Sequence, residues 1–424
     1  MDALDIKLLR DFRKLALQGL AIAVVLACGV AILLTAFGMH RALIDTRSAY
    51  YERNRFADIF VETRRAPLRL LDDIRAIAGV IAAEPRVQGM AVLDLPDRVD
   101  LAMGQLLSWP SGNDPLLNEP ILRRGLPPER AGEVMVSDAF ARANDFDIGD
   151  GFFANINGQR RALIITGTAV SPEFIYTIGP GALMPDNAGF GILWLPEAEM
   201  AAAFDMSGAF NHLSLSLSRG TQPEDVTARL DALLDPYGGL GAYGRDGQLS
   251  DSFVATEIDQ LRAMAVVVPP VFFVISAFLV GMVMSRIVSL ERAQIGLLKA
   301  LGYPDGRIAL HYLLLAGLIA LLGVALGWGA GSMLARAMAG QYAQFFDFPY
   351  LIFRVPAWVY GMSGLAALAT TMAGALRAAL MAARLPPAIA MQPPAPPAFR
   401  HTMADRVMAH LALNQTSIMI WRSV

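Results

Sequence analysis

Four long runs of apolar residues constrain this chain more than any other feature. Each is long enough to cross about 30 Å of hydrocarbon as a helix, which takes roughly 20 residues. We place the four spans at residues 17–39, 263–285, 308–335 and 355–383. Within these limits the one charged side chain is Arg377, near enough to the end of the fourth run to reach the interface. The sequence therefore predicts a membrane protein, in agreement with 55% hydrophobic and 17% charged residues.

Basic residues precede the first run, as they would in a secretory signal peptide. The run is longer than a usual signal-peptide core, and no small-x-small cleavage site follows it, so we interpret it as a retained anchor. Apolar residues recur at helical spacing from Leu4 to Leu15, between cations. This pattern predicts an interfacial cytoplasmic helix over residues 1–16. A simple cytoplasmic extension of the first span is the alternative.

The orientation follows from where the cations lie. They gather before span one, between spans two and three, and at the end of span four. The positive-inside rule then places both termini and the loop 286–307 in the cytoplasm. Residues 40–262 and the short loop 336–354 lie outside, which in a bacterial cell means the periplasm.

The segment 40–262 is long enough to form a core of its own. Apolar residues repeat every three or four positions over 67–85, which predicts a helix there, and the stretches 137–147 and 223–235 predict two more. Between the last two of these helices lie four β-rich stretches, "GFFANING", "RRALIITGTAVS", "FGILWLP" and "HLSLSLS", with a hairpin turn at Asn157-Gly158. We therefore expect an α-helical membrane protein with four transmembrane helices and a large extracytoplasmic α+β domain between the first and second.

Several function classes find no support in the sequence. A net charge of -3 without a basic run argues against a nucleic-acid partner. The five histidines are scattered, and "DFDIGDG" at 145–151 lacks the acid that would complete a calcium loop, so we expect no metal site. No Gly-Lys pair is present, so there is no Walker A motif. We expect no enzyme and no cofactor in this chain.

The loop 286–307 changes character at once after the second span. Ile287, Leu290, Gln294, Ile295, Leu298 and Leu301 are expected along one side of a short helix. Gly302 is placed to end that helix in a left-handed conformation, and Pro304 prevents its continuation. Such a helix could fill a groove on a soluble partner. Alternatively, it rests on lipid.

The stretch "ERAQIGLLKALG", residues 291–302, resembles the signature of FtsX-like and MacB-like ABC transporter permeases. The topology expected above is also similar to theirs, as is the segment 236–265 that leads into the second span. This sequence has Gln294 where better-known members carry Glu. The resemblance implies that the helix couples to an ATPase through Glu291, Arg292, Gln294, Ile295, Gly296, Leu298, Lys299, Ala300, Leu301 and Gly302.

The resemblance further implies a permease subunit in the bacterial inner membrane, paired with a separate cytoplasmic ABC ATPase that binds ATP and Mg²⁺. A second permease unit, membrane lipid and a periplasmic protein are the other partners it implies. ATP hydrolysis would then move the periplasmic domain to export or extract an amphiphile, such as a lipid, lipoprotein, peptide or drug. Two alternatives stay open: a transmembrane regulator of a periplasmic envelope hydrolase, and a membrane receptor without an ATPase.

Three further features concern packing and the end of the chain. Gly323, Gly327 and Gly331 form a small-residue row, which we assign to packing within the bundle in preference to homodimerisation. Pro269-Pro270 predicts a kink or break in the second span. Residues 384–402 form a Pro-rich cytoplasmic linker, and 403–424 resume an amphipathic character that resembles the start of a second permease unit, or form an ordinary interfacial tail.

Overall fold

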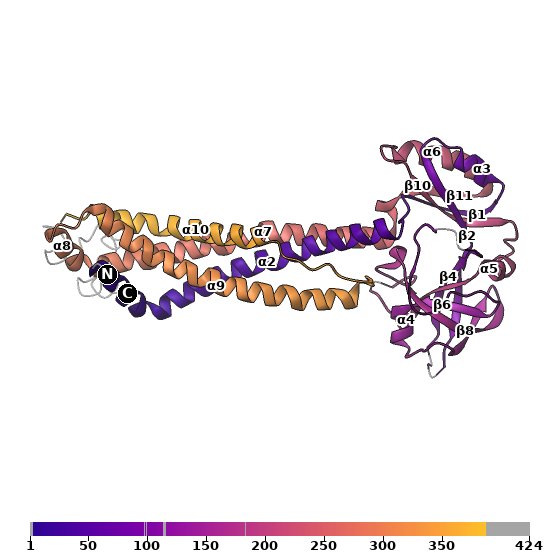
Figure 1. Cartoon of the computed structure of the whole chain (residues 1–424), viewed down its shortest axis with the longest axis horizontal. Helices are drawn as coiled ribbons and strands as arrows, with labels where there is room; N and C mark the ends of the chain where they lie inside the picture. Colours follow the sequence, from indigo (N-terminus) through magenta and orange to yellow (C-terminus); the bar gives the residue numbers. More distant parts are fainter. Residues whose placement is uncertain (1–2, 97, 99, 113–115, 183, 387–424) are drawn as a thin grey trace, which may run out of the picture. The chain divides into compact units, whose positions relative to one another are not determined.

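A computed structural model describes residues 3–96, 98, 100–112, 116–182 and 184–386 (Figure 1). Most of the linker predicted at 384–402, and the whole amphipathic tail at 403–424, lie outside the described residues. The chain divides into two compact units. Of the described residues, one unit holds 3–14, 278–316 and 372–386, and the other holds those within 15–277 and 317–371.

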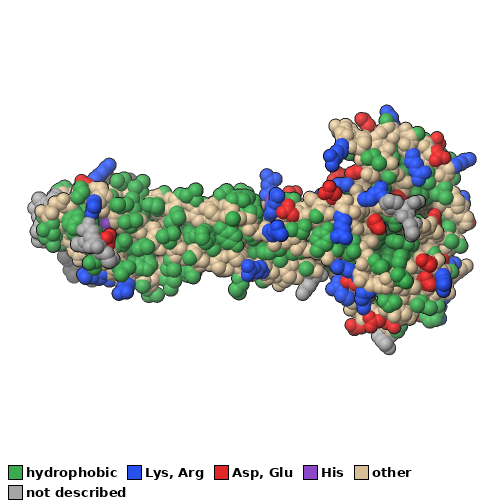
Figure 2. Space-filling view, viewed as in Figure 1, with side chains coloured by type: hydrophobic (Ala, Val, Ile, Leu, Met, Phe, Trp, Pro, Cys, Tyr) green, Lys and Arg blue, Asp and Glu red, His purple; other side chains and the backbone are tan. Residues whose placement is uncertain are grey.

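The four predicted spans are confirmed as four long apolar helices within the described residues. They are α2 (Ala16–Arg53), α7 (Leu249–Leu290), α9 (Asp305–Phe345) and α10 (Ala357–Arg384). Two short helices accompany them, α1 (Ala3–Lys14) and α8 (Arg292–Ala300). In Figure 2 many of the side chains on the visible face of the long helices are hydrophobic. The helices are longer than the apolar runs because their backbone hydrogen bonding continues into polar residues, which a hydropathy scan does not count as part of a span.

The prolines of the second span do not break its helix. Pro269 and Pro270 lie inside α7, which is continuous from Leu249 to Leu290. Proline is tolerated inside membrane helices because neighbouring groups compensate for the lost hydrogen bond. The predicted break is therefore wrong.

The glycine row of span three lies against span one within the chain. A Cβ added at Gly323 would lie 2.9 Å from the Ala23 carbonyl oxygen, and one at Gly327 would lie 2.6 Å from Val30 Cβ. Gly331 is equally close to α2, and Thr35 Oγ1 donates a 3.2 Å hydrogen bond to its carbonyl oxygen. The row thus gives α9 and α2 the close backbone approach that small residues permit.

Residues 54–248, here called the extramembrane domain, contain two β-sheets. The smaller sheet has the strand order β11-β1-β10-β2, and all its neighbours are antiparallel. Its strands are β1 (Ile59–Pro67), β2 (Val80–Arg86), β10 (Ala209–Leu217) and β11 (Gly239–Gly244). Helices α3 (Leu70–Arg75) and α6 (Pro223–Leu234) share its apolar core, in which Ile74 and Leu230 are fully buried.

The larger sheet has the strand order β5-β8-β6-β9-β4-β3-β7, and an extra β7–β8 pairing closes six of its strands into a ring. Asn157 and Gly158, both at positive φ, form the predicted hairpin between β7 and β8. Its strands are β3 (Gln88–Asp94), β4 (Ala102–Trp109), β5 (Ile121–Gly125), β6 (Glu133–Ser137), β7 (Gly151–Ile156), β8 (Gln159–Val170) and β9 (Phe190–Pro196). Helix α4 (Asp138–Ala143) connects β6 to β7, and α5 (Glu197–Ala203) connects β9 to β10 of the smaller sheet.

The helix predicted over 67–85 is wrong for its second half. Only α3 is helical, and from Val80 the chain is strand β2, paired with β10. Gly79 separates the two elements at φ +97°, a conformation that favours glycine. The helix predicted from Ser137 is correct in position, although the Ser137 hydroxyl accepts a hydrogen bond from the Ile192 amide and does not cap the helix.

The loop between α9 and α10 is bound to the extramembrane domain and to α2. It covers residues 346–356, shorter than predicted because α9 continues to Phe345. The Asp347 amide donates to the Ile175 carbonyl at 2.8 Å, and Arg123 donates to the Pro349 carbonyl at 2.7 Å. The Ile352 amide donates to Thr46 Oγ1 at 2.9 Å. The loop is therefore a fixed connection.

Candidate coupling site

The short helix predicted between spans two and three is α8. Only Glu291 separates α8 from α7. Two backbone hydrogen bonds beyond the last helical turn cap the C-terminus of α8. The Gly302 amide donates to the Lys299 carbonyl at 3.0 Å, and the Tyr303 amide donates to the Leu298 carbonyl at 3.2 Å. With Gly302 at φ +91°, this is a Schellman motif, as the sequence predicts.

Two sides of α8 have different surroundings. Ile295 is only 1% exposed and Gly296 is also buried, so this side faces the rest of the same unit. Leu297 is 53% exposed and lies about 200° around the helix from Ile295. Leu290, the last residue of α7, and Leu301, the C-cap of α8, are 75% and 69% exposed, and together with Leu297 they form what we call the leucine face of α8.

This arrangement corrects the assignment of Ile295 and Gly296. The sequence grouped Ile295 with Leu290 and Leu301 on one partner-facing side, but burial leaves Ile295 and Gly296 no surface for a partner. Among the other candidate residues, Gln294, Ala300, Leu301 and Gly302 are exposed, whereas Arg292 and Leu298 are half-buried. The apolar residues of this helix extend far enough around it that Ile295 packs within its own unit while Leu297 is exposed.

Glu291, the first residue of the motif, also faces inward. Lys7 Nζ on α1 donates to Glu291 Oε2 at 2.7 Å, and the Tyr312 hydroxyl on α9 donates to the same oxygen at 3.1 Å. Lys7 also pairs with Asp11, and Asp11 Oδ2 lies 3.3 Å from His311 Nε2. The motif's acid therefore joins three helices, and it does not extend toward a partner.

Lys299 has a similar internal role at the other end of α8. Its ammonium donates to the Ala383 carbonyl on α10 and lies 2.8 Å from Asp305 Oδ1 at the start of α9. The carbonyl belongs to the last turn of α10, where a helix has carbonyls without an intrahelical partner and favours a cation. Glu291 and Lys299, two of the three charged motif residues, thus hold α8 in place from both ends.

Sequence reasoning missed Lys7, Asp11, His311 and Tyr312. The i,i+4 spacing of Lys7 and Asp11 is a usable signal for their pairing. Nothing local connects either residue to Glu291 or His311, which lie some 300 positions away. Within the described ranges no group of three or more histidine, cysteine or acidic residues is placed to hold a metal ion.

A short helix with an exposed apolar face thus lies between two apolar spans. A comparison with known protein families matches the same part of the chain. Residues 266–387 match the family described as FtsX-like permease C-terminal. This part of the chain is similar to the C-terminal domain of FtsX-like permeases. It includes most of α7 and all of α8, α9 and α10. FtsX-like permeases are membrane subunits and not ATPases themselves, and with its four apolar helices the chain is a multi-pass membrane protein.

The α+β domain is similar to domains of solved transporter and permease structures. The extracellular domain of the noncanonic ABC-type transporter YknZ from Gram-positive bacteria has a TM-score of 0.30 at 10% identity, over 43% of this chain and 97% of that chain. The periplasmic region of MacB from Actinobacillus actinomycetemcomitans has a TM-score of 0.30 at 8% identity, over 49% and 95%. A domain of a putative permease from Porphyromonas gingivalis has 0.29 at 15%, over 45% and 90%. Among curated proteins, none matches this sequence.

Proposed function

We propose that this chain is the membrane subunit of an ABC transporter and that α8 is its coupling helix. The leucine face of α8 docks in a groove of a separate cytoplasmic ATPase, which binds ATP and Mg²⁺. The observation that carries the proposal is the exposure of Leu290, Leu297 and Leu301 on a helix whose other side is held by Ile295, Glu291 and Lys299. A helix held this firmly passes an applied force to α7 and α9.

The same arrangement supports mechanotransmission toward the periplasm. Helix α7 is unbroken from α8 to the extramembrane domain, and the 346–356 loop connects α9 and α10 to that domain. Each nucleotide cycle therefore moves the domain. In this proposal the membrane is the bacterial inner membrane, both termini are cytoplasmic, and the domain is periplasmic and accessible to a periplasmic partner.

A second permease unit completes the transporter. In its most apolar window α7 is only 22% buried, compared with 56% for α2. The uncovered face of α7 is the surface that a second unit or lipid would cover. Close backbone contact through the glycine row is not open to that second unit, because α2 already occupies it.

An apolar crevice near the loop supports an amphiphilic substrate. Tyr176, Phe253, Phe345 and Phe346 line a cavity of about 280 Å³ together with the polar groups of Glu257 and Tyr342, which hydrogen-bond to each other. Aromatic walls beside one acid suit a molecule with an apolar body and a polar head. Export or extraction of such a molecule is the transport step that we propose.

The coupling is tested by purifying the protein in detergent from native membranes and measuring the Mg²⁺-dependent ATPase activity that co-purifies. We expect Leu297→Asp and Leu301→Asp each to abolish most of it, since a charge in an apolar groove is strongly unfavourable. The control is Leu126→Asp, because Leu126 in the extramembrane domain is 71% exposed, close to the 69% of Leu301. Equal ATPase recovery in all three variants would contradict the proposal.

The orientation is tested separately with a membrane-impermeant maleimide. Cys28 is the single cysteine, so Cys28→Ser gives a background without thiols. We expect Arg160→Cys, exposed on β8, to be labelled in intact cells, and Gln294→Cys, exposed on α8, only after lysis. The reverse pattern would place α8 outside and end the proposal.

A further inference from the structure

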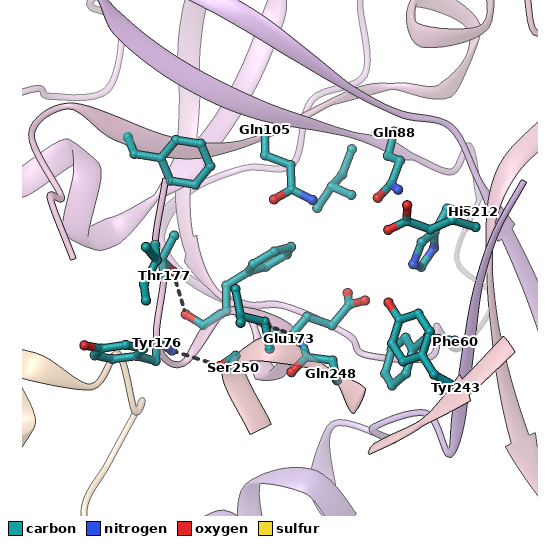
Figure 3. A pocket seen from close by; sticks show the side chains of 16 residues that line it. Phe60, Gln88, Gln105, Glu173, Tyr176, Thr177, His212, Tyr243, Gln248 and Ser250 are labelled. Atoms are coloured by element: carbon teal, nitrogen blue, oxygen red, sulfur yellow. Dashed lines mark hydrogen bonds between the residues drawn. The ribbon is translucent and has the colours of Figure 1, made fainter. Parts of the chain in front are cut away.

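The extramembrane domain contains a second cavity, between its two sheets, that the proposed function does not use. It measures about 230 Å³ (Figure 3). Strands β1, β10 and β11 contribute Phe60, Glu62, His212 and Tyr243 from the smaller sheet. Strands β3 and β4 contribute Gln88 and Gln105 from the larger one, and the first turn of α7 closes one side.

Glu62 and His212 are cross-strand neighbours on the wall of this cavity. They are directly opposite each other in the antiparallel β1–β10 pairing, so their side chains emerge on the same face of the sheet. His212 is 6% exposed, and its Nδ1 has no hydrogen-bond partner. Among the described residues none forms an ion pair or hydrogen bond with the Glu62 carboxylate. A buried ring nitrogen and a carboxylate can thus both still accept hydrogen bonds.

Two side-chain amides face the same space. The Gln88 and Gln105 side chains make no hydrogen bond to another described residue, and in Figure 3 both point toward the space that His212 faces. The neighbouring Gln248 differs, since its Nε2 donates to the Glu173 carbonyl and its Oε1 accepts from the Asp251 amide, both at 2.7 Å. The Gln248 bond also satisfies a first-turn amide of α7 that could otherwise attract an anion.

The charge of the lining is negative. Neither lysine nor arginine lines the cavity, and its two acids are Glu62 and Glu173. Glu173 is neutralised by Arg86 behind it, at 2.6 Å, whereas Glu62 is not. Burial lowers the pKa of His212 to about 3, so the imidazole is neutral at physiological pH and does not repel a cation. Burial and, next, the carboxylates of Glu62 and Glu173 raise the pKa of Tyr243 to about 12.

The walls beside these polar groups are aromatic. The rings of Phe60 and Tyr243 stack with centroids 5.9 Å apart, and Phe174, Tyr176 and Phe190 also line the cavity. Aromatic faces attract cations and also pack against an apolar body. A polar end with one unpaired carboxylate and an aromatic remainder is the combination that recognises an amine.

We propose that this cavity is a binding site for a small organic cation, in which a protonated amine pairs with Glu62 and donates hydrogen bonds to the side-chain oxygens of Gln88 and Gln105. The apolar body of the ligand packs on Phe60 and Tyr243. Because the cavity lies between the two sheets, a bound ligand holds them together. The site goes beyond the proposed function and does not depend on an ATPase partner.

The test uses the full chain in detergent and three probes of nearly the same shape, 2-phenylethylamine, 2-phenylethanol and 3-phenylpropionate. We expect isothermal titration to detect the amine at millimolar concentration or below, and to detect neither the alcohol nor the carboxylate. Hydrogen exchange in β10 should slow only with the amine, because β10 carries His212. Equal binding of the alcohol, or no binding of any probe at millimolar concentration, would overturn the proposal.

The variant Glu62→Gln keeps the shape of the side chain and removes its charge. It should bind the amine about tenfold or more weakly, as expected for losing a hydrogen bond to a charged group. Glu224→Gln, at an exposed acid on α6, is the matched control and should bind normally. Since Glu62 has no internal partner, both variants should unfold at the wild-type temperature. Unchanged amine affinity in a folded Glu62→Gln protein would also overturn the proposal.

Discussion

Lys7 Nζ on α1 lies 2.7 Å from Glu291 Oε2 at the start of α8, although 284 positions separate the two residues in the chain. Both side chains are mostly buried, with 18% and 15% of their surface exposed. The acid that opens the family motif is therefore occupied within its own subunit. It fixes the N-terminal helix α1 to the start of α8, and the leucine face contains only uncharged residues.

Breaking this pair should loosen α1. Lys7→Met and Glu291→Gln should each lower the free energy of unfolding by about 1.5–3 kcal/mol, since each leaves a charged partner poorly satisfied. The double variant should cost less than the two single losses added together. Thermal unfolding in detergent measures the cost. Arg41→Met is the control, because the exposed Arg41–Asp45 pair should contribute about 0–1 kcal/mol.

Gly327 and Gly329 offer a matched pair on one helix. A Cβ at Gly327 would lie 2.6 Å from Val30 Cβ, whereas one at Gly329 would meet nothing within 4 Å. We expect Gly327→Leu to force α9 and α2 apart and to destabilise the protein by about 1–3 kcal/mol or more. Gly329→Leu should be neutral or slightly stabilising because leucine favours helix. Equal melting temperatures for the two variants would refute the close packing.

His212 should make the extramembrane domain sensitive to acid. Burial, and then the positive charge of Arg86, lower its pKa from 6.5 to about 3 in the folded protein. Below pH 6.5 the unfolded chain therefore binds a proton that the folded protein does not, and stability falls as the pH falls toward 3. The slope from this residue is at most about 1.4 kcal/mol per pH unit. His212→Gln should flatten the pH profile of the melting temperature over this range, and parallel profiles would contradict the assignment.

Asp347, in the α9–α10 loop, should have the opposite effect. Burial raises its pKa from 3.8 to about 6, while Arg142, 3.8 Å away, opposes the shift. The folded protein thus binds the proton first as the pH falls, so the stabilisation is complete below pH 3.8 and is lost as the pH rises through 6. Asp347→Asn should raise stability at pH 7.5 by about 1–3 kcal/mol and change little at pH 4. A gain of the same size at both pH values would argue against an ionised Asp347.

The spans and most strands follow from local patterns. Apolar runs predict α2, α7, α9 and α10, and β-branched alternation with Asn157-Gly158 predicts β7 and β8. The chain after Gly79 does not follow its local pattern, since β2 is a strand only because its residues, such as Ala83, pair with Leu215 far along the chain. Helical periodicity can be recognised in a short stretch of sequence, whereas a strand partner more than a hundred residues away cannot.

The candidate site was predictable in position but not in the direction of its side chains. Gly302 and Pro304 fix the end of α8 through backbone conformation alone, so the sequence predicts it. Whether Ile295 or Leu297 faces outward depends on what α1, α9 and α10 bring to the helix. Those contacts join residues hundreds of positions apart, as Lys7 and Glu291 illustrate.

The hydrogen bonds of the 346–356 loop have a mechanical consequence. Two spans, α2 and α7, enter the extramembrane domain by chain continuity, and the loop attaches the outer ends of the remaining two by the bonds from Asp347 and Arg123. A domain anchored by all four spans resists swinging about a single hinge. In the proposed mechanism its displacement is a tilt or lift shared among the anchors, so detaching one of them should diminish that displacement without abolishing it.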